Sequence, residues 1–350
     1  MPTELPKPLD DKPLLAVLKG ERREPVPMWM MRQAGRYLPE YRQLRHDKGS
    51  FLELVYDPDA AARVTLQPLD RFPEFDAAIL FSDILIVPFA IGQNLTFIAG
   101  EGPRLTPPLA SASLDDLTPF LTRLEPIYET VARVRAQLGE GKTLIGFAGS
   151  PWTVATYMVA GQGSRDQSEA RRLAYADESR FGEIIARIEH VTTDYLSRQI
   201  DAGAEAVQLF DSWSGSLSPA QFEQWVIAPT ARIVCALRER HAGVPVIGFP
   251  KGAGGKLPAY ARETAVSALG LDETVDPRWA AKELPRDLPL QGNLDPLALA
   301  AGGEALKAAV RRVLDAFGDR PHIFNLGHGI LQDTPVEHVG DLIALVKGGR

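Results

Sequence analysis

The sequence has little with which to build a disulfide, a metal site or a membrane span. Only one of its 350 residues is cysteine, and a single Cys235 cannot form a disulfide within the chain. Its place in ARIVCALRER predicts the buried side of a helix, where it would serve core packing. The six histidines form no H-E-x-x-H pair, and no apolar stretch is long enough to cross a bilayer. We therefore expect no metal and no transmembrane helix.

Net positive charge is also missing. The formal net charge of -7 argues against binding to nucleic acid, because such binders carry a basic face. The N-terminal MPTELPKPLDDKPLL lacks the basic and apolar regions of a secretion signal, so we expect a cytoplasmic protein. Clusters of Pro, Gly and Ser at 103–113, 285–296 and 347–349 are too short for interdomain linkers. We expect one domain over residues 1–350, with a short N-terminal extension of about residues 1–13.

One segment departs from this acidic background. Residues 21–50 contain seven basic and four acidic side chains, a local charge of +3 in a chain of net charge -7. The stretch MRQAGRYLPEYRQLR supplies four of the basic residues, all arginines. Because the planar guanidinium binds carboxylates through two hydrogen bonds, several arginines suit a ligand with several carboxylates. The segment predicts a specific anionic partner.

Short apolar runs alternate with longer amphipathic stretches along the chain. The predicted strands are 26–31, 77–81, 144–147, 206–210, 244–249, 268–271, 288–291 and 322–325, and the clearest helical stretches are 57–70, 116–138, 178–201, 219–240 and 303–316. This βαβα pattern predicts a parallel sheet, and eight units favour a distorted (β/α)8 barrel of the α/β class. An open doubly wound sheet is the alternative that periodicity leaves open.

A barrel places its active site in the loops that follow the strands. Polar residues stand at each of these positions, and they are Arg32, Arg36, Ser82, Asp83, Ser150, Asp211, Ser212, Lys251, Asp272, Asn293, Asp295, Asn325 and His328. Arg32 and Arg36, beside Gln33 and Gly35, are expected to bind rather than to face solvent. Arg42 and Arg45 lie three residues apart on a predicted helix and could instead be solvated or pair with Glu40.

Other candidates have structural alternatives. Asp83 in AAILFSDILIVP either caps the next helix or accepts hydrogen bonds from a ligand with N–H groups. Ser150 is expected to cap a helix, and Tyr157 on that helix is either a core residue or a ligand contact. Ser212 in LFDSWSG lacks the G-x-S-x-G context of a nucleophile and is expected to donate a hydrogen bond.

The glycine-rich stretch GFPKGAGGKL fits neither phosphate-binding motif. Pro250 and Leu257 stand where G-x-x-x-x-G-K-[ST] needs Gly and Ser or Thr, and G-x-G-x-x-G fails at Leu257 as well. Lys251 could form a Schiff base, be solvated or pair with an anion. His328 in NLGHGI is flanked by glycines that let a ligand approach, or it is a turn residue bonded to a nearby carbonyl.

Seven stretches together carry a resemblance, and they are PMWMMRQAGRYLPEYR, FSDILIVP, SPWTVATYM, QLFDSWSGSLS, GFPKGAG, QGNLDP and FNLGHGI. The sequence resembles the uroporphyrinogen decarboxylase family from about Leu14 to near the C-terminus. The resemblance implies a distorted (β/α)8 barrel that forms a homodimer and needs neither metal nor organic cofactor. It also implies that four acetate arms of uroporphyrinogen III lose carbon dioxide to give coproporphyrinogen III in porphyrin and haem synthesis.

The resemblance further implies residue roles. Residues 32–36, which are Arg32, Gln33, Ala34, Gly35 and Arg36, would contact the substrate, with Arg45 a weaker candidate. Asp83 would accept hydrogen bonds from the pyrrole N–H groups and stabilise developing positive charge. Tyr157, Ser212 and His328 would bind carboxylate arms, and Phe210 would line the cleft. Arg32 is one proposal for the proton donor, with a bound water or a substrate carboxylate as the others.

Two rival functions remain at this stage. A zinc- or corrinoid-dependent methyltransferase of the same superfamily would share the barrel but would need a thiolate site that one cysteine cannot build. A non-catalytic polycarboxylate-binding barrel would explain the arginines and leave Asp83 without a purpose.

Overall fold

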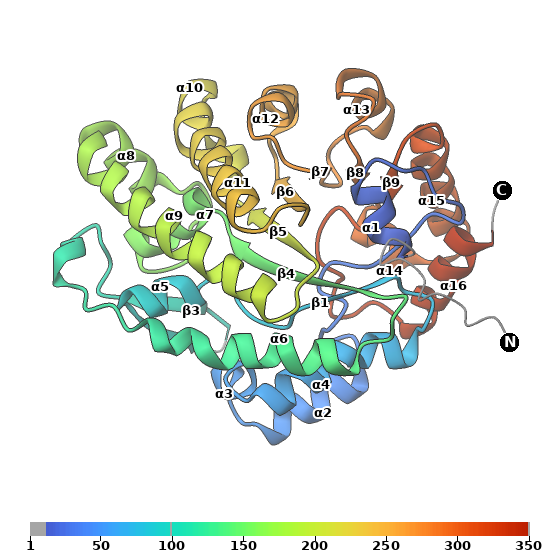
Figure 1. Ribbon diagram of the computed structural model, residues 1–350, viewed down its shortest axis with the longest axis horizontal. Helices are drawn as coiled ribbons and strands as arrows, with labels where there is room; N and C mark the ends of the chain where they lie inside the picture. Colours follow the sequence, from blue (N-terminus) through green and yellow to red (C-terminus); the bar gives the residue numbers. More distant parts are fainter. Residues whose placement is uncertain (1–11, 99, 349–350) are drawn as a thin grey trace, which may run out of the picture.

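A central sheet of parallel strands is surrounded by helices in the computed structural model, which describes residues 12–98 and 100–348 (Figure 1). The strands of this sheet are β1 (Ala77–Ile79), β4 (Thr143–Gly149), β5 (Ala206–Asp211), β6 (Val246–Pro250), β7 (Ala268–Gly270), β8 (Leu290–Gln291) and β9 (His322–Ile323). Their order in the sheet is β1-β4-β5-β6-β7-β8-β9, and every neighbouring pair is parallel. Since strand order never reverses, the doubly wound alternative is excluded.

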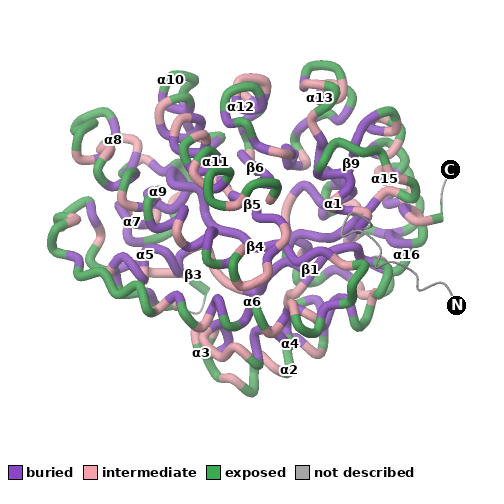
Figure 2. Tube along the Cα trace, viewed as in Figure 1, coloured by how far each residue is buried: buried purple, intermediate pink, exposed green. Residues whose placement is uncertain are grey.

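The helices connect successive strands and cover the outside of the sheet. The α-helices are α1 (Pro13–Leu18), α2 (Pro39–Asp47), α3 (Phe51–Val55), α4 (Pro58–Arg71), α5 (Ile86–Ile91), α6 (Glu125–Gln137), α7 (Pro151–Ala160), α8 (Ser168–Ala176), α9 (Glu178–Asp201), α10 (Pro219–Phe222), α11 (Ala228–Arg240), α12 (Leu257–Glu263), α13 (Pro277–Glu283), α14 (Pro296–Ala301), α15 (Gly303–Phe317) and α16 (Val336–Lys347). Short 3-10 turns are η2 (Leu114–Asp116), η3 (Leu121–Leu124), η4 (Ser214–Ser216) and η6 (Gly254–Lys256). The strands and the inner faces of the helices are buried (Figure 2). No helix in the described part of the chain is long and apolar enough to cross a membrane.

The first predicted strand, 26–31, is reduced to a single bridge, yet it joins the two edges of the sheet. Met28 forms an isolated parallel bridge with Phe324, just after β9. On its other side the Met28 carbonyl accepts from the Asp76 backbone N–H (2.9 Å), directly before β1. The segment therefore takes the place of the eighth strand, and the predicted barrel is confirmed in a distorted form.

One buried carboxylate reinforces this closure. Asp76 Oδ2 accepts from the Met28 backbone N–H (2.7 Å) and pairs with Lys347 Nζ (2.5 Å) at the end of α16. The Asp76 side chain is only 10% exposed, so the pair is largely shielded from water. N-terminal and C-terminal segments thus meet at the same edge of β1, and α1 packs beside β9 (Figure 1).

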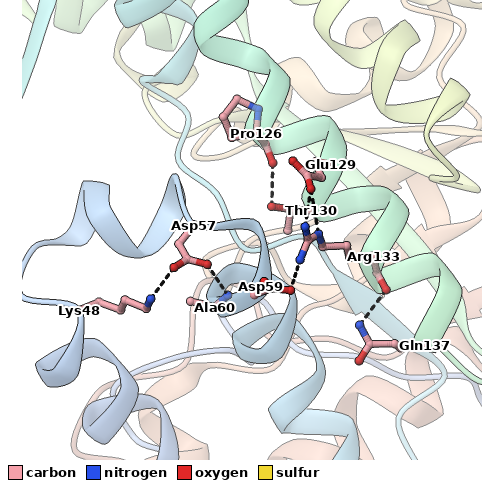
Figure 3. Close-up of polar contacts among 9 residues, drawn as sticks. All are labelled: Lys48, Asp57, Asp59, Ala60, Pro126, Glu129, Thr130, Arg133 and Gln137. Atoms are coloured by element: carbon pink, nitrogen blue, oxygen red, sulfur yellow. Dashed lines mark hydrogen bonds and ion pairs between the residues drawn. The ribbon is translucent and has the colours of Figure 1, made fainter.

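Exposed ion pairs link the helices on the outer surface. Asp57 caps α4 by accepting from the Ala60 N–H (3.0 Å). Arg133 on α6 pairs with Asp59 in the first turn of α4 and with Glu129 one turn earlier on its own helix (Figure 3). The Asp59 side chain is 84% exposed, so this contact adds little to stability.

Several local predictions were wrong. Residues 102–106, in a cluster expected to form turns, make β3 (Gly102–Thr106), which pairs with β2 (Asn94–Ile98) in an antiparallel hairpin. The helix expected from 116 begins at Glu125, after two 3-10 turns, with Pro126 in its first turn. The stretch 219–240 is helical but contains a π segment, Glu223–Ile227. Pro229 has no N–H to give to the carbonyl four residues earlier, which accounts for the local change in pitch.

Cys235 is also not where the sequence suggested. The side chain is exposed on α11, whereas Ile233, Val234 and Leu237 form the buried side of that helix. An apolar neighbourhood in the sequence misled the prediction, because the helix turns Cys235 toward the charged side. Of the expected extension 1–13, residues 1–11 lie outside the described residues, and Pro13 begins α1.

Asp76→Ala should lower the free energy of unfolding by about 3 kcal/mol, because it leaves Lys347 and the Met28 N–H without their shielded partner. Asp59→Ala, which removes an exposed pair, is the matched control and should change it by less than about 1 kcal/mol. Urea denaturation of both variants measures this difference. Equal losses would show that Asp76 does not hold the barrel closed.

Candidate active site at the barrel mouth

The carboxyl ends of the strands place most of the predicted residues around one mouth of the barrel. Arg32 follows residues 26–31, the closing segment that bridges the two edges of the sheet. Asp83 follows β1, Tyr157 lies on α7 after β4, Ser212 follows β5 and His328 follows β9. These side chains come from separate regions of the sequence. Parallel strands bring them to a common end, as the barrel prediction required.

Arg32 is held in a left-handed backbone conformation. Its φ is +59°, which costs a residue with a side chain about 1 kcal/mol. The turn that follows is tight, because a Cβ atom on Gly35 would lie 2.7 Å from the Arg32 carbonyl oxygen. Arg32 itself is exposed. This strained conformation places the Arg32 guanidinium at the mouth of the barrel.

Gln33 supports this turn from beneath. Its side chain is fully buried, its Oε1 accepts from the Met30 N–H (3.1 Å), and its Nε2 donates to the Ala77 carbonyl of β1 (3.0 Å). The predicted contact between Gln33 and a ligand stays a prediction. In this structure the side chain braces the loop that carries Arg32.

The two motifs that lie farthest apart in the sequence touch at Arg32. A Cβ atom on Gly329 would lie 2.3 Å from Cδ of Arg32, so only glycine leaves room for that side chain. His328, next to Gly329, is half-buried, and burial followed by the charges of Arg32 and Lys251 lowers its pKa to about 4. At neutral pH the imidazole is therefore uncharged and can donate one N–H.

Asp83 combines the two roles that the sequence left open. Its Oδ1 accepts from the Leu85 N–H (2.8 Å) in the turn that leads into α5, while Oδ2 has no hydrogen-bond partner among the described residues. Although part of the residue faces solvent, burial raises the pKa of the carboxyl to about 6. The Leu85 hydrogen bond and the Arg32 charge oppose this rise. The group is a carboxylate at neutral pH with one oxygen free.

An aromatic wall lies beside these charges. Tyr157 is half-buried and stands 6.5 Å from Trp213, ring centre to ring centre. Burial and the negative charge of Asp83 raise the pKa of its phenol, and Arg32 lowers it. Phe210 is partly exposed at the end of β5 and packs edge-on against Phe147 (5.6 Å) and Phe249 (5.9 Å). These rings give the mouth an apolar side.

Arg36 is less closely tied to this group. It is exposed, and its guanidinium has no hydrogen bond or ion pair with a described residue. Its carbonyl accepts from Arg42 (3.0 Å). The suggested pairing of Arg42 or Arg45 with Glu40 is wrong: Glu40 accepts two hydrogen bonds from Arg71 (2.7 and 2.9 Å), and Arg45 donates to the Gly49 carbonyl (2.8 Å). Ala34 lies in the same turn and is half-buried.

Most remaining polar residues at the strand ends serve the fold. Asp211 accepts from Thr153, Asp295 accepts from the Leu297 N–H (2.8 Å), and Asn325 Oδ1 accepts from the Met31 N–H (2.9 Å). Ser150 stands at the N-cap of α7 as predicted, but its hydroxyl makes no capping bond. Strand-end position alone therefore selects too many residues.

Sequence reasoning noted the glycines beside His328 without predicting that Gly329 meets Arg32, and it left Lys251 open between a Schiff base, a solvated side chain and an anion pair. Gly329 could have been found from the G-H-G pattern, since paired glycines often mark a close approach. Lys251 follows β6 and is half-buried, and its ammonium group makes no hydrogen bond or ion pair with a described residue. No three His, Cys, Asp or Glu side chains in residues 12–98 and 100–348 are grouped so that they could hold a metal ion.

Two surface hollows of about 400 Å³ lie elsewhere. One is bordered by Ser267, Leu288 and Pro289, at the amino ends of β7 and β8, and the other by Cys235 and Arg238 on α11. Neither contains a predicted site residue. The chemistry-bearing side chains belong to the opposite, carboxyl end of the barrel.

Comparison with known proteins bears on the family of this chain. Residues 9–348 match the model of the family described as uroporphyrinogen decarboxylase (URO-D). A uroporphyrinogen decarboxylase from Rhizorhabdus wittichii is 67% identical, with 97% of this chain and 99% of the relative covered. One from Sphingopyxis alaskensis is also 67% identical, over 97% of this chain and 98% of the relative.

A solved structure of a methyltransferase from Methanosarcina mazei resembles the fold, with a TM-score of 0.80 over 97% of this chain and 98% of that one. Its sequence identity is 18%, so the likeness concerns the fold alone. The match of the family model across nearly the whole chain, together with relatives at two-thirds identity, shows that this chain belongs to the uroporphyrinogen decarboxylase family.

Proposed function

We propose that this chain removes carbon dioxide from the four acetate arms of uroporphyrinogen III and releases coproporphyrinogen III. Membership of the family and the names of its close relatives support this activity. One observation in the structure carries the proposal: Asp83, a carboxylate with a free oxygen, lies in the same mouth as the exposed guanidinium of Arg32. A porphyrinogen offers both groups a partner, since it has N–H donors at its centre and carboxylates around its rim.

The chemistry needs an electron sink, and the substrate can supply one. Protonation of a pyrrole α-carbon gives an iminium-like ring, which accepts the electron pair released when the bond between an acetate methylene and its carboxylate breaks. Carbon dioxide leaves, a second proton adds to the exocyclic carbon to complete the methyl group, and the first proton is lost again from the α-carbon, which restores the pyrrole. The ring thus does the work that an organic cofactor does elsewhere, so the proposal includes no metal or cofactor.

Asp83 is the residue best placed to help this step. Positive charge develops on the pyrrole as it is protonated, and a carboxylate nearby stabilises the charged state more than the neutral substrate. Oδ1 is fixed by the Leu85 N–H, so Oδ2 is held ready to accept from the pyrrole N–H groups. Burial leaves the carboxylate poorly solvated before substrate binds, which is why its pKa is raised. A poorly solvated carboxylate attracts a cation more strongly.

The substrate's carboxylates would be bound around Asp83. Arg32 and Arg36 supply charge, the neutral His328 supplies one N–H, and Tyr157 and Ser212 supply hydroxyls. Phe210 would contact a pyrrole face, and the backbone of Ala34 and Gly35 would border the ligand beside Arg32. Roles for Gln33 and Arg45 are weaker, since their side chains are already bonded within the protein.

The proton donor is assigned to Arg32 in this proposal, on the strength of the resemblance. A guanidinium is a weak acid, because it holds its proton throughout the physiological pH range. It acts only if the substrate's carbon is a strong enough base in the bound state. A water held by Arg32 or a neighbouring substrate carboxylate would deliver the proton through the same position.

The methyltransferase rival rests on a fold likeness at 18% identity. Cys235, the only thiol in the sequence, lies on the outer side of α11 beside a hollow remote from the mouth. A barrel that only binds polycarboxylates does not explain why a partly buried carboxylate, Asp83, lies among the cations of the mouth. Decarboxylation assayed anaerobically with uroporphyrinogen separates the three functions.

The proposal also covers assembly and location. We expect the chain to act as a single (β/α)8 domain, as a homodimer, and in the cytoplasm, as the family resemblance implies. Analytical ultracentrifugation at assay concentrations tests the dimer directly. Sedimentation as a monomer under conditions of full activity would remove the dimer from the proposal.

Asp83→Asn should reduce turnover by roughly two to three orders of magnitude, because the variant keeps the size of the side chain and removes its charge. Asp83→Glu, which keeps the charge one methylene away, should retain part of the activity. Single-turnover decarboxylation of bound uroporphyrinogen measures both, with thermal melts as the check on folding. A folded Asn variant that turns over at the wild-type rate would leave Asp83 as a structural cap only.

The same substitution should stabilise the protein at neutral pH. The carboxyl has a pKa of about 6 when folded and about 3.9 when unfolded, so the folded state binds the proton more tightly. Its contribution to stability is therefore fully present below pH 4 and is lost as pH rises through 6. Asp83→Asn should gain roughly 1 to 2 kcal/mol over wild type at pH 7.5 and almost nothing at pH 4, after allowance for partial solvent exposure. Urea denaturation at the two pH values measures this gain, and a gain independent of pH would contradict the assigned burial.

Arg36→Lys should weaken substrate binding by roughly 1.5 to 3 kcal/mol, because the lysine keeps the charge and loses the fork that binds both carboxylate oxygens. Arg278→Lys, an exposed arginine on α13, is the matched control. Steady-state kinetics should show the loss in kcat/KM for the first variant alone. Unchanged kinetics for Arg36→Lys would assign that side chain to the solvent.

A further inference from the structure

Lys251 is a half-buried cation at the mouth that the proposed mechanism leaves unused. Its main chain is fixed on both sides. Its N–H donates to the Asp211 carbonyl (3.0 Å), and its carbonyl accepts from the Gly215 N–H (3.1 Å) and the Ser214 hydroxyl (2.9 Å). The next residue, Gly252, donates its N–H to Asp272 Oδ2 (2.8 Å). Loops after β5, β6 and β7 therefore converge to hold this backbone in place.

The ammonium group has no such partner. It makes no hydrogen bond or ion pair with any described residue. Lys256, in the same loop, differs because its ammonium group has partners. Its Nζ donates to the Leu217 carbonyl (2.8 Å) and lies 4.9 Å from the centre of the Phe222 ring. The ammonium group of Lys256 is thus bonded to a carbonyl of the loop after β5, whereas that of Lys251 is available to bind a ligand.

The acidic residues whose groups hold the backbone of this loop, Asp211 and Asp272, form no ion pair with Lys251. Both oxygens of Asp272 are occupied, Oδ2 by the Gly252 N–H and Oδ1 by Thr274. Asp211 accepts from Thr153, and burial raises its pKa to about 7. The positive charge of Lys251 reaches His328, whose pKa it lowers together with Arg32. Two cations without an ion-pair partner among the described residues therefore face the same neutral imidazole.

Strand order sets the positions of these two cations. Counting from the closing segment that carries Arg32, β6 is reached through β1, β4 and β5 in one direction and through β9, β8 and β7 in the other. Lys251 therefore stands on the wall opposite Arg32. Asp211 and Pro250 are register partners and the Lys251 N–H donates to the Asp211 carbonyl, so Ser212 and Lys251 leave the ends of two neighbouring strands.

We propose that Lys251 and Ser212 form a second carboxylate-binding subsite, on the β6 side of the mouth, for an arm of the tetrapyrrole that Arg32 and Arg36 cannot reach. The inference rests on the proposed function for the identity of the ligand. A rigid ring with carboxylates on every side needs donors on opposite walls. An ammonium beside a hydroxyl supplies two donors to one carboxylate. A Schiff base has no place here, because an imine needs an aldehyde or ketone and the arms are carboxylates.

Lys251→Met, Lys251→Arg and the matched control Lys282→Met test the subsite. Lys282 lies on α13 with its side chain 83% exposed, so its replacement removes the same charge from the surface. Lys251→Met should raise KM for uroporphyrinogen by roughly 10- to 100-fold. It should raise the Kd for coproporphyrinogen III, measured by anaerobic calorimetry, by roughly the same factor. Lys251→Arg should keep most of the affinity, and the kcat values should stay within a few-fold of wild type. The double variant with Ser212→Ala should lose little more than Lys251→Met, because both donors serve one carboxylate.

Product binding that is unchanged in Lys251→Met would overturn the subsite. So would a collapse of kcat with binding intact, since that result would make Lys251 an acid or base. Should Lys251→Met unfold, Lys251→Cys in a Cys235→Ser background provides the second measurement. Alkylation with bromoethylamine restores an ammonium at residue 251 and should restore binding, and failure to do so would contradict the proposal. A wild-type protein that binds coproporphyrinogen through Lys251 but never decarboxylates would refute the proposed function while the subsite stands.

Discussion

Residues 27–29 hydrogen-bond to both edges of the parallel sheet, and the arrangement of the mouth depends on this closure. Without it, β1 and β9 would each present an unpaired edge. Asp76 contributes three of the contacts, through its backbone N–H and its bonds to the Met28 N–H and Lys347. The closure also fixes the direction in which the chain leaves Met30. Arg32 reaches the mouth because this short segment is held at both sides.

The mouth contains several cations without an ion-pair partner among the described residues and one carboxylate, Asp83, that is open to a ligand. Arg32, Arg36 and Lys251 carry positive charge without an ion-pair partner among the described residues, and His328 is neutral. Asp272 is bonded through both oxygens, and Asp211, whose Oδ2 has no partner in the described part of the chain, is fully buried. Of these three acids, Asp83 is the one that combines a free oxygen with partial exposure. A polyanionic ligand is attracted by the surrounding cations, and a cation that develops within it is attracted by Asp83.

The sequence predicted the architecture better than its details. Regular alternation of apolar runs indicated the barrel, because strand order follows from repeated βαβ units. It could not show that residues 26–31 would pair only at Met28, since the number of ladder bonds depends on how two distant edges meet. The exposure of Cys235 depends on the rotation of α11, and a stretch of ten residues did not settle it. At the candidate site, Arg32, Asp83 and His328 were predicted from their motifs, and the structure brings them to one end of the barrel, while their roles stay predictions. The bracing role of Gln33 and the contact of Gly329 with Arg32 needed coordinates, because both depend on distances across the fold.

That contact has a consequence for how the protein is made. Arg32 leaves the ribosome long before Gly329, against which its side chain packs. The same delay applies to Phe324, which pairs with Met28, and to Lys347, which pairs with Asp76. Until Phe324 has been made, the side of residues 27–29 that faces away from β1 stays an open edge, and open edges invite pairing with other chains. The nascent protein is therefore exposed to such pairing until Phe324 and α16 have been made, because these supply the contacts that close the barrel.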